Sequence, residues 1–150
     1  MKIKLSVSKE HYQEIKAALL AHGIEIDENS DLILSENSRF IDNILVKDIK
    51  KNERIYLSTN DIVSIESFGH SVEVYTQDSA YQIPERLYKI ANQLDPAKFL
   101  RISNSVIIAR DKIKIINPTL SMKFILTMSN GRKVDVTRSY YYIFKDFLGI

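Results

Sequence analysis

Short alternating segments separated by turn residues fill the middle of the chain, and they constrain its fold more than any other feature. Five such segments precede residue 84, and each is shorter than a typical helix. They lie at 43–49, 54–58, 61–67, 71–76 and 80–83. Short strands at this spacing, with turns between them, favour antiparallel pairing. The sequence therefore predicts a mainly β (α+β overall) fold built largely from antiparallel sheets.

The same pattern continues toward the C-terminus. Asn130-Gly131 is the strongest hairpin signal in the sequence, because this dipeptide readily adopts the positive φ angles of a two-residue β-turn. It joins the alternating segments 123–129 and 132–138, and a further strand is predicted at 112–116. This part of the chain is therefore expected to add three strands.

Two short helices are predicted within this β-rich part. Pro84 opens the first helix, at 84–94, in the first-turn position where proline is tolerated, and Asp95-Pro96 ends it. Ser139 is expected to cap the second helix. The tyrosines at 140–142 fall on its helical spacing, so we interpret them as core and interface residues more than as an exposed aromatic platform.

Residues 99–113 place hydrogen-bonding side chains inside an apolar run. Phe99, Ile102 and the aliphatic run 106–108 are suited to the core. Arg101 and Ser105 are expected to support a loop, because a buried loop needs partners for backbone groups that would otherwise be unpaired.

The first 41 residues form a separate, acidic β-α-β-β extension. Residues 2–7 alternate like a strand, Ser8 can cap a helix that Gly23 ends, and 31–35 is a further strand. The boundary is placed near residue 41, which gives two parts, 1–41 and 42–150. An element of about forty residues is too small to fold alone dependably, so we interpret it as an input, dimer or packing element.

Composition excludes several classes of protein. The chain has no cysteine, which removes disulfides, thiolate nucleophiles and cysteine-type zinc sites. No apolar run approaches the length of a membrane helix, and we expect a cytoplasmic location. His11 and His22 stand about 16 Å apart on a helix and cannot share one metal ion. We expect no metal and no cofactor.

Catalysis is not expected either. The chain contains no nucleophile elbow, zinc-protease, dinucleotide-binding or phosphate-loop motif. An enzyme would have to use His70 with Glu66, Asp61 or Ser71 as partners, a grouping that any loop could show by chance. We therefore predict that the protein is not an enzyme.

The positive charge is concentrated in the last third. Residues 98–150 hold ten Lys/Arg against three Asp/Glu, whereas residues 1–41 hold five against seven. Such a concentration suggests a polyanionic partner, although charge alone is equally consistent with a solvated basic face.

Together these segments resemble the LytTR DNA-binding domain of bacterial transcription regulators. The resemblance covers roughly residues 42–150, and its order and spacing are more specific than any single piece. Its most telling motif is a phenylalanine, an arginine two residues later, a polar pair and a serine before an aliphatic run. Here these are Phe99, Arg101, Ser103-Asn104, Ser105 and 106–108. The resemblance implies an elongated assembly of small antiparallel sheets that contacts DNA through loops.

The resemblance also implies which residues contact DNA. Base contacts would fall to His70, Asn104 and Arg138, and phosphate contacts to Lys123, Arg132 and Lys133. Arginine can bond guanine, asparagine can bond adenine, and histidine can bond a base edge. Family members often carry histidine at Ser103 and asparagine at Ala109, so this chain departs from the pattern there.

The sequence therefore predicts a stand-alone, sequence-specific regulator of transcription that binds double-stranded DNA as a homodimer on repeated sites. The first 41 residues are too short for a receiver domain and lack its acidic pocket, so phosphorelay input is not expected. The resemblance to stand-alone members of the family implies control by a membrane-protein partner that contacts this acidic element, and a packing or dimer extension is the alternative. The alternative is a protein-interaction or ligand-sensing module with a weakened DNA face. Single-stranded nucleic acid binding is a third, weaker hypothesis, because the tyrosine run is better explained by helix packing.

Overall fold

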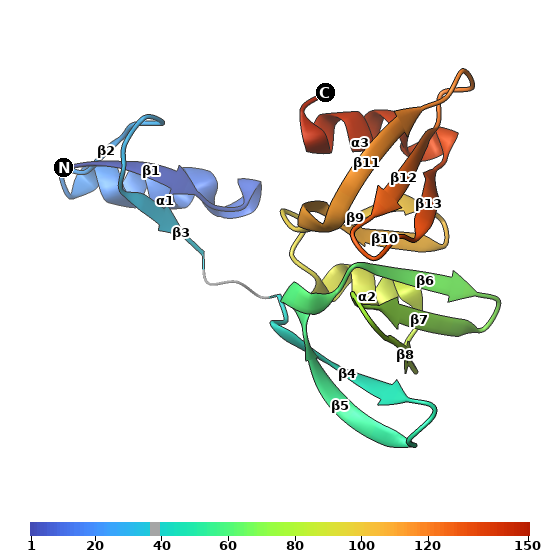
Figure 1. Ribbon diagram of the computed structural model, residues 1–150. Helices are drawn as coiled ribbons and strands as arrows, with labels where there is room; N and C mark the ends of the chain where they lie inside the picture. The colour runs from blue at the N-terminus through green and yellow to red at the C-terminus, as the bar shows by residue number, and fades with distance from the viewer. Residues whose placement is uncertain (37–39) are drawn as a thin grey trace. The chain divides into compact units, whose positions relative to one another are not determined.

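The chain forms two compact units, Met1–Arg39 and Phe40–Ile150. The computed structural model describes residues 1–36 and 40–150 (Figure 1). No helix in these two ranges is long and apolar enough to span a membrane.

The first unit is a small parallel sheet with one helix. Its elements are β1 (Lys2–Ser6), α1 (Lys9–Ala21), β2 (Glu25–Ile26) and β3 (Ile33–Ser35). Both β2 and β3 pair in parallel with β1, and they do not pair with each other. The buried hydrophobic side chains described in this unit are Ile3 and Leu5, and α1 has no fully buried residue. The core of this unit is therefore small.

The start of α1 is tied to the end of β3. Ser8 occupies the cap position, but its hydroxyl donates to Glu36 Oε1 at 3.0 Å and makes no cap hydrogen bond to the helix. Glu36 also accepts from the Ser8 backbone N–H and lies 3.1 Å from Nδ1 of His11. These contacts, the Ser8 backbone N–H first, lower the pKa of the Glu36 carboxyl.

A seven-stranded antiparallel sheet forms most of the second unit. Its strand order is β5-β4-β8-β7-β6-β10-β9. The strands are β4 (Asn43–Asp48), β5 (Glu53–Ser58), β6 (Ser64–Phe68), β7 (Ser71–Tyr75), β8 (Ala80–Ile83), β9 (Phe99–Ser103) and β10 (Val106–Ala109). A 3₁₀ turn, η1 (Thr59–Asp61), replaces the start of the strand predicted at 61–67. The prediction of a mainly antiparallel β fold is confirmed for this unit.

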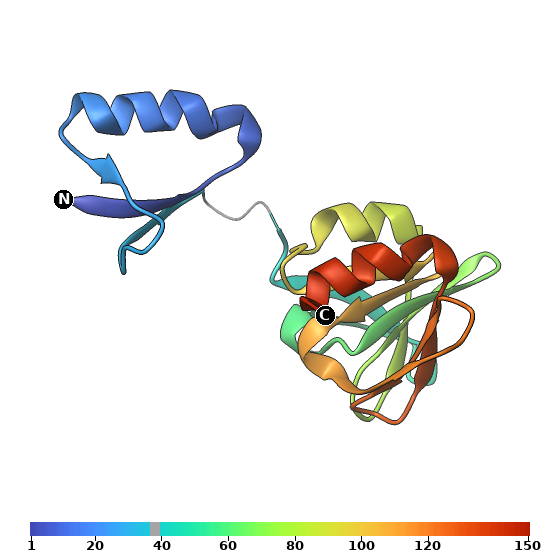
Figure 2. The same ribbon diagram turned by 90° about the horizontal axis from the view of Figure 1, so that it is seen from above.

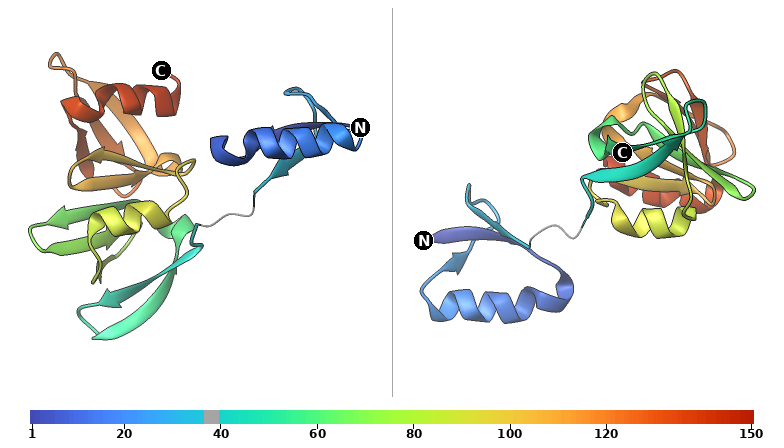
Figure 3. Two further views of the ribbon diagram at one scale, coloured as in Figure 1. Left: turned by 180° about the vertical axis from the view of Figure 1, so that it is seen from behind. Right: turned by 90° about the horizontal axis from the view of Figure 1, so that it is seen from below.

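A three-stranded antiparallel sheet and a helix complete the second unit. The sheet has the order β11-β12-β13, from β11 (Ile113–Pro118), β12 (Phe124–Met128) and β13 (Lys133–Val136). The 3₁₀ turn η2 (Arg110–Lys112) precedes it, and η3 (Arg138–Tyr140) leads from it into α3 (Tyr141–Leu148). Seen from behind, α2 (Leu87–Gln93) and α3 lie in front of the strands, so both helices cover the same side of this unit (Figure 3).

The run at 106–108 is continuously apolar because β10 is buried on both faces. Ile107 belongs to a core cluster with Ile65 and Ile90 of α2. Ile108 belongs to a second cluster with Leu126 and Phe144 of α3. Alternate side chains of a strand point to opposite faces, so a strand between two cores needs apolar residues at every position. The view from above shows α2 and α3 on the same side of the strands of this unit (Figure 2).

Both predicted helices begin later than expected. Pro84 lies ahead of α2, whose cap position is taken by Arg86, so proline does not fill its first turn. Ser139 lies inside η3, and Tyr140 holds the cap position of α3. Tyr141 stacks on Phe124 with ring centroids 5.0 Å apart, whereas Tyr142 is 64% exposed. The tyrosine run is therefore only partly core.

Candidate nucleic-acid interface

The first of the three predicted base-contact loops carries His70 and joins β6 to β7. Phe68 of β6 pairs with Ser71 of β7, which leaves Gly69 and His70 as a two-residue turn. Gly69 has φ +60°, a conformation that glycine adopts without steric cost. His70 is exposed at the tip. We call these two residues the His70 turn.

Asn104 and Ser105 form a second turn, the Asn104 turn, between β9 and β10. Arg101 holds this turn from inside: its Nε donates to the carbonyl of Ser103 at 3.2 Å and a terminal nitrogen to that of Asn104 at 2.5 Å. The backbone N–H of Ser105 donates to Ser103 Oγ at 3.2 Å. The Asn104 and Ser105 side chains remain exposed.

Arg138 is exposed at the start of η3, and this turn is bonded to the Asn104 turn. The backbone N–H of Thr137 donates to the carbonyl of Ile102 at 3.1 Å. The hydroxyl of Tyr140 donates to Asn104 Oδ1 at 3.3 Å. An amide oxygen has two lone pairs, so Asn104 can still accept from a second partner while its NH₂ group donates.

Two surface hollows meet at Asn104. The first, of about 360 Å³, is lined by residues that include His70, Arg101 and Asn104. The second, of about 570 Å³, is lined by residues that include Asn104, Ser105 and Lys133. Arg138 lines neither hollow, but its two neighbours in sequence line the second one. The fold thus gathers predicted contact residues from both sheets of the second unit around Asn104.

The predicted phosphate contacts do not form a single group. Lys133 is the first residue of β13 and Lys123 directly precedes β12, so the register places them at opposite ends of this hairpin. Both are exposed. Arg132 differs, because its guanidinium pairs with the buried carboxylate of Glu66, with Nε 2.8 Å from Oε2 and a terminal nitrogen 3.0 Å from Oε1.

The Arg132 pair is electrostatically coupled to Tyr75. The guanidinium carbon of Arg132 lies 3.6 Å from the centre of the Tyr75 ring. The hydrogen bond to Glu66 raises the pKa of Arg132. Burial, followed by the hydrogen bond that its hydroxyl donates to Glu73, raises the pKa of Tyr75 to about 12. Arg132 is therefore a firmly charged group.

Arg86 is a basic residue at this surface that the sequence analysis did not single out. It is exposed and lines the first hollow together with His70 and Asn104. The pairing of Val72 with Ile83 brings the chain after β8 back beside the His70 turn. Sequence spacing hides this proximity, because the sequence places Arg86 inside the helix predicted at 84–94.

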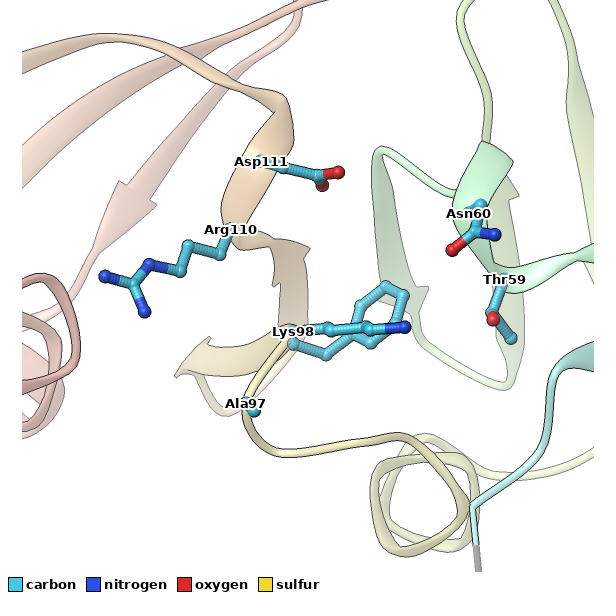
Figure 4. A pocket seen from close by; sticks show the side chains of 7 residues that line it. Thr59, Asn60, Ala97, Lys98, Arg110 and Asp111 are labelled. Carbon is cyan, nitrogen blue, oxygen red and sulfur yellow. The ribbon is translucent and has the colours of Figure 1, made fainter. Parts of the chain in front are cut away.

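A third hollow lies at the far ends of β9 and β10 from the Asn104 turn. It measures about 170 Å³, and the residues that line it include Asn60, Lys98, Arg110 and Asp111 (Figure 4). Figure 4 shows the Arg110 side chain directed away from Asn60, and its guanidinium carbon lies 5.2 Å from the ring centre of Phe147. This hollow is small and remote from the predicted contacts, so it does not extend the interface.

The two departures from the family pattern lie in the core of the β9–β10 hairpin. Ser103 is buried, and its hydroxyl lies 3.4 Å from that of Ser105 as well as accepting from the Ser105 backbone. Ala109 is buried in the first core cluster. Serine and alanine at these positions therefore have structural partners in this chain.

Glu66, one of the partners that a catalytic His70 would need, is paired with Arg132. Glu66 is committed to Arg132 and accepts from Ser64 Oγ at 2.9 Å. His70 lies at the exposed tip of the hairpin. In residues 1–36 and 40–150, no three His, Asp or Glu side chains lie together in a way that could hold a metal ion.

Three comparisons with known proteins show which family this chain resembles. The family model described as LytTr DNA-binding domain matches residues 52–149. Sensory transduction protein LytT of Enterococcus faecalis is 30% identical over 103 residues, which cover 68% of this chain and 43% of that protein. Transcriptional regulatory protein LytR of Staphylococcus aureus is 27% identical over 125 residues, 83% of this chain and 50% of that protein. The chain spans about half the length of the curated relatives it matches.

The fold is also that of a solved domain. The structure described as the LytTr DNA-binding domain of a putative methyl-accepting/DNA response regulator from Bacillus cereus superposes with a TM-score of 0.69 at 24% identity. The match covers 73% of this chain and 99% of that one. On the family match over most of its length, this chain belongs to the LytTr DNA-binding domain family.

Proposed function

We propose that this protein regulates transcription by binding double-stranded DNA at specific sequences. The observation that carries the proposal is the assembly of the three predicted turns: His70 and Asn104 line one hollow, and the Arg138 turn is hydrogen-bonded to the Asn104 turn. The printed names of the relatives, a sensory transduction protein and a transcriptional regulatory protein, support the same role.

Each exposed side chain suits base recognition in the major groove. Arg138 can bond O6 and N7 of guanine with two N–H groups, and Asn104 can bond N6 and N7 of adenine. His70 can donate to or accept from a base edge. Because all three side chains project from turns, this chain would present loops to the groove, not a recognition helix.

Lys123 and Lys133 are assigned to phosphate contacts. Both are exposed and lie at opposite ends of the β12–β13 hairpin, so one strand of a duplex running along the hairpin could reach both. Phosphate contacts add affinity for any sequence and make binding depend on salt. Arg132 was predicted to share this role, but two of its nitrogen atoms already donate to Glu66.

Selection of bound sequences from a random duplex library, at a stated salt concentration, tests the proposal directly. Enrichment of one motif is the expected result. The absence of any enriched sequence, together with binding that does not respond to salt, would sink the proposal.

Two substitutions separate base contacts from phosphate contacts. Arg138→Ala should cost about 1–3 kcal/mol on the selected sequence and relax one base position. Lys133→Ala should weaken binding to all sequences alike and reduce the salt slope by about one. Equal behaviour of the two variants on selected and scrambled duplexes would contradict these assignments.

We further propose that two copies occupy repeated sites, and that residues 1–41 contact another protein, such as a membrane-protein partner. Exposed side chains at the end of the first unit favour this second role: Leu32, Ile33 and Leu34 are 56%, 63% and 41% exposed. Ile33→Ser with Leu34→Ser should leave DNA affinity unchanged and abolish capture of that partner. Loss of DNA binding in this variant would instead assign the segment to the DNA-bound assembly.

A further inference from the structure

The residues predicted to contact DNA come from two different sheets. The two sheets must therefore be held in a fixed position relative to each other. His70 and Asn104 lie in turns of the seven-stranded sheet, whereas Lys133 begins β13 of the three-stranded sheet and Arg138 follows that strand. Base recognition requires side chains to be held within about 0.5 Å of the productive position. Apolar packing between the sheets is non-directional and does not by itself set that geometry.

Among the residues that the structure describes, directional bonds between the two sheets occur at two places. One is at the Asn104 turn and the end of β9 before it, where Tyr140 donates to Asn104 and Thr137 to Ile102. The other is the β12–β13 turn, where Asn130 Nδ2 donates to the Thr76 carbonyl at 3.0 Å and Arg132 pairs with Glu66. The two sheets are also joined covalently through η2 and share the second core cluster, so directional bonds at two separate places add a defined orientation to this contact.

The geometry points to the Glu66–Arg132 pair as the element that positions the two sheets for DNA recognition. We infer that Arg132 acts on binding through this pair and not as a phosphate contact, an inference that rests on the function proposed above. Glu66 is 6% exposed, and its neighbour Ser67 donates a backbone hydrogen bond to Ser105 in the Asn104 turn at 2.8 Å. Arg132 directly precedes Lys133. The pair therefore links β6, which is bonded to the Asn104 turn, to the segment that carries Lys133.

The arrangement of the pair fits positioning better than simple stabilisation. A bidentate arginine–carboxylate pair has a fixed, planar geometry, and here it also has Ser64 Oγ on the carboxylate and the Tyr75 ring over the guanidinium. Buried ion pairs often contribute little net stability because both charges lose their hydration. The two-point contact between Arg132 and Glu66 fixes the relative orientation of the two segments that carry them.

Two conservative substitutions test this inference in the full chain. Arg132→Lys keeps the charge but cannot bond both carboxylate oxygens in the same way, and Glu66→Gln removes a carboxylate that has no attraction for phosphate. Each variant is titrated against the selected duplex and a scrambled duplex of the same length over a range of salt. Lys133→Ala is the phosphate-contact control. Ile90→Val, a substitution in the first core cluster, is the control for lost stability.

Both variants should lower the ratio of selected to scrambled affinity by about tenfold. Scrambled-duplex affinity and the salt slope should stay as in the wild type, and Ile90→Val should keep the wild-type ratio. An unchanged ratio in the two variants overturns the inference. So does a parallel loss on both duplexes with a reduced salt slope, as in Lys133→Ala, or an equal loss of ratio in Ile90→Val. If the wild-type protein selects no sequence, the proposed function fails, and the inference fails with it.

Discussion

The His70 turn and the Asn104 turn are both two-residue connections in one sheet, yet they are held very differently. The Asn104 turn is fixed by Arg101 through two carbonyls, by Ser103, and by Tyr140 on the amide itself. The His70 side chain has no hydrogen-bond partner among the residues that the structure describes, and its turn depends on the conformation of Gly69. One turn is pre-organised and the other can adjust.

This difference bears directly on binding energy. Ordering a free side chain at an interface costs about 0.5–1.5 kcal/mol, and a side chain that is already ordered avoids this cost. We therefore expect Asn104 to contribute more net affinity than His70, although both line the same hollow. The following predictions are ordered by the size of the expected effect.

Removing the support of the Asn104 turn should have the largest effect. Arg101→Ala leaves the carbonyls of Ser103 and Asn104 without their charged donor, and such hydrogen bonds contribute about 1.5–3 kcal/mol. Specific affinity should fall by about 3 kcal/mol in a fluorescence titration. Arg101→Lys keeps the charge but not the two-point contact and should lose most of the same affinity. Wild-type affinity in the lysine variant would show that the charge, and not the held turn, matters.

The next largest effects should come from removing the Asn104 and His70 side chains, and the two losses of affinity should differ. Asn104→Ala should cost about 2 kcal/mol on the selected duplex, and His70→Ala about 1 kcal/mol because part of its contact energy is spent on ordering. Isothermal titration calorimetry measures both values under one set of conditions. A larger loss for His70→Ala would reverse the comparison between the turns.

The sequence was sufficient to predict the strands and the family because both follow from local patterns. Period-two alternation marked β4 to β8, and Asn130-Gly131 marked the β12–β13 hairpin. Local patterns were less informative about where the helices begin. Pro84 and Ser139 are good starting residues by chemistry, but tertiary packing places Leu87 and Phe144 in the core and starts α2 and α3 later.

Contacts that join distant parts of the chain could not be predicted. Glu66 and Arg132 are 66 residues apart, and only the docking of the β12–β13 turn against the end of β7 brings them together. From the sequence alone, Arg132 is one more cation in a basic segment and Glu66 one acidic residue in a strand. The site residues themselves came from the family resemblance, and their contacts with DNA remain predictions.

A substitution at Gly69 should lower the stability of the folded protein moderately, because no side chain in the part of the chain that the structure describes holds the His70 turn. In Gly69→Ala the new methyl group meets no atom within 4 Å, but φ is +60°, a conformation that costs other residues about 1 kcal/mol. The midpoint of thermal unfolding should fall by about 4 °C. Gly69→Asn is the matched control and should lose less, because asparagine tolerates this conformation. Equal losses in both variants would indicate that the side chain, not the backbone, is the cause.

The smallest effect is expected for Tyr75, which ends β7 on the side opposite His70, and this effect on stability should appear only in alkaline solution. His70 precedes β7 and is free, whereas Tyr75 at its end contacts Arg132 and donates to Glu73. The pKa of Tyr75 is raised from 10.0 to about 12, so the folded protein binds this proton more tightly than the unfolded chain. The resulting stabilisation is complete below pH 10.0 and is lost as the pH rises toward about 12. Tyrosinate absorbance should therefore show a late step that Tyr75→Phe lacks, and identical titrations of the two proteins would contradict a fixed end of this strand.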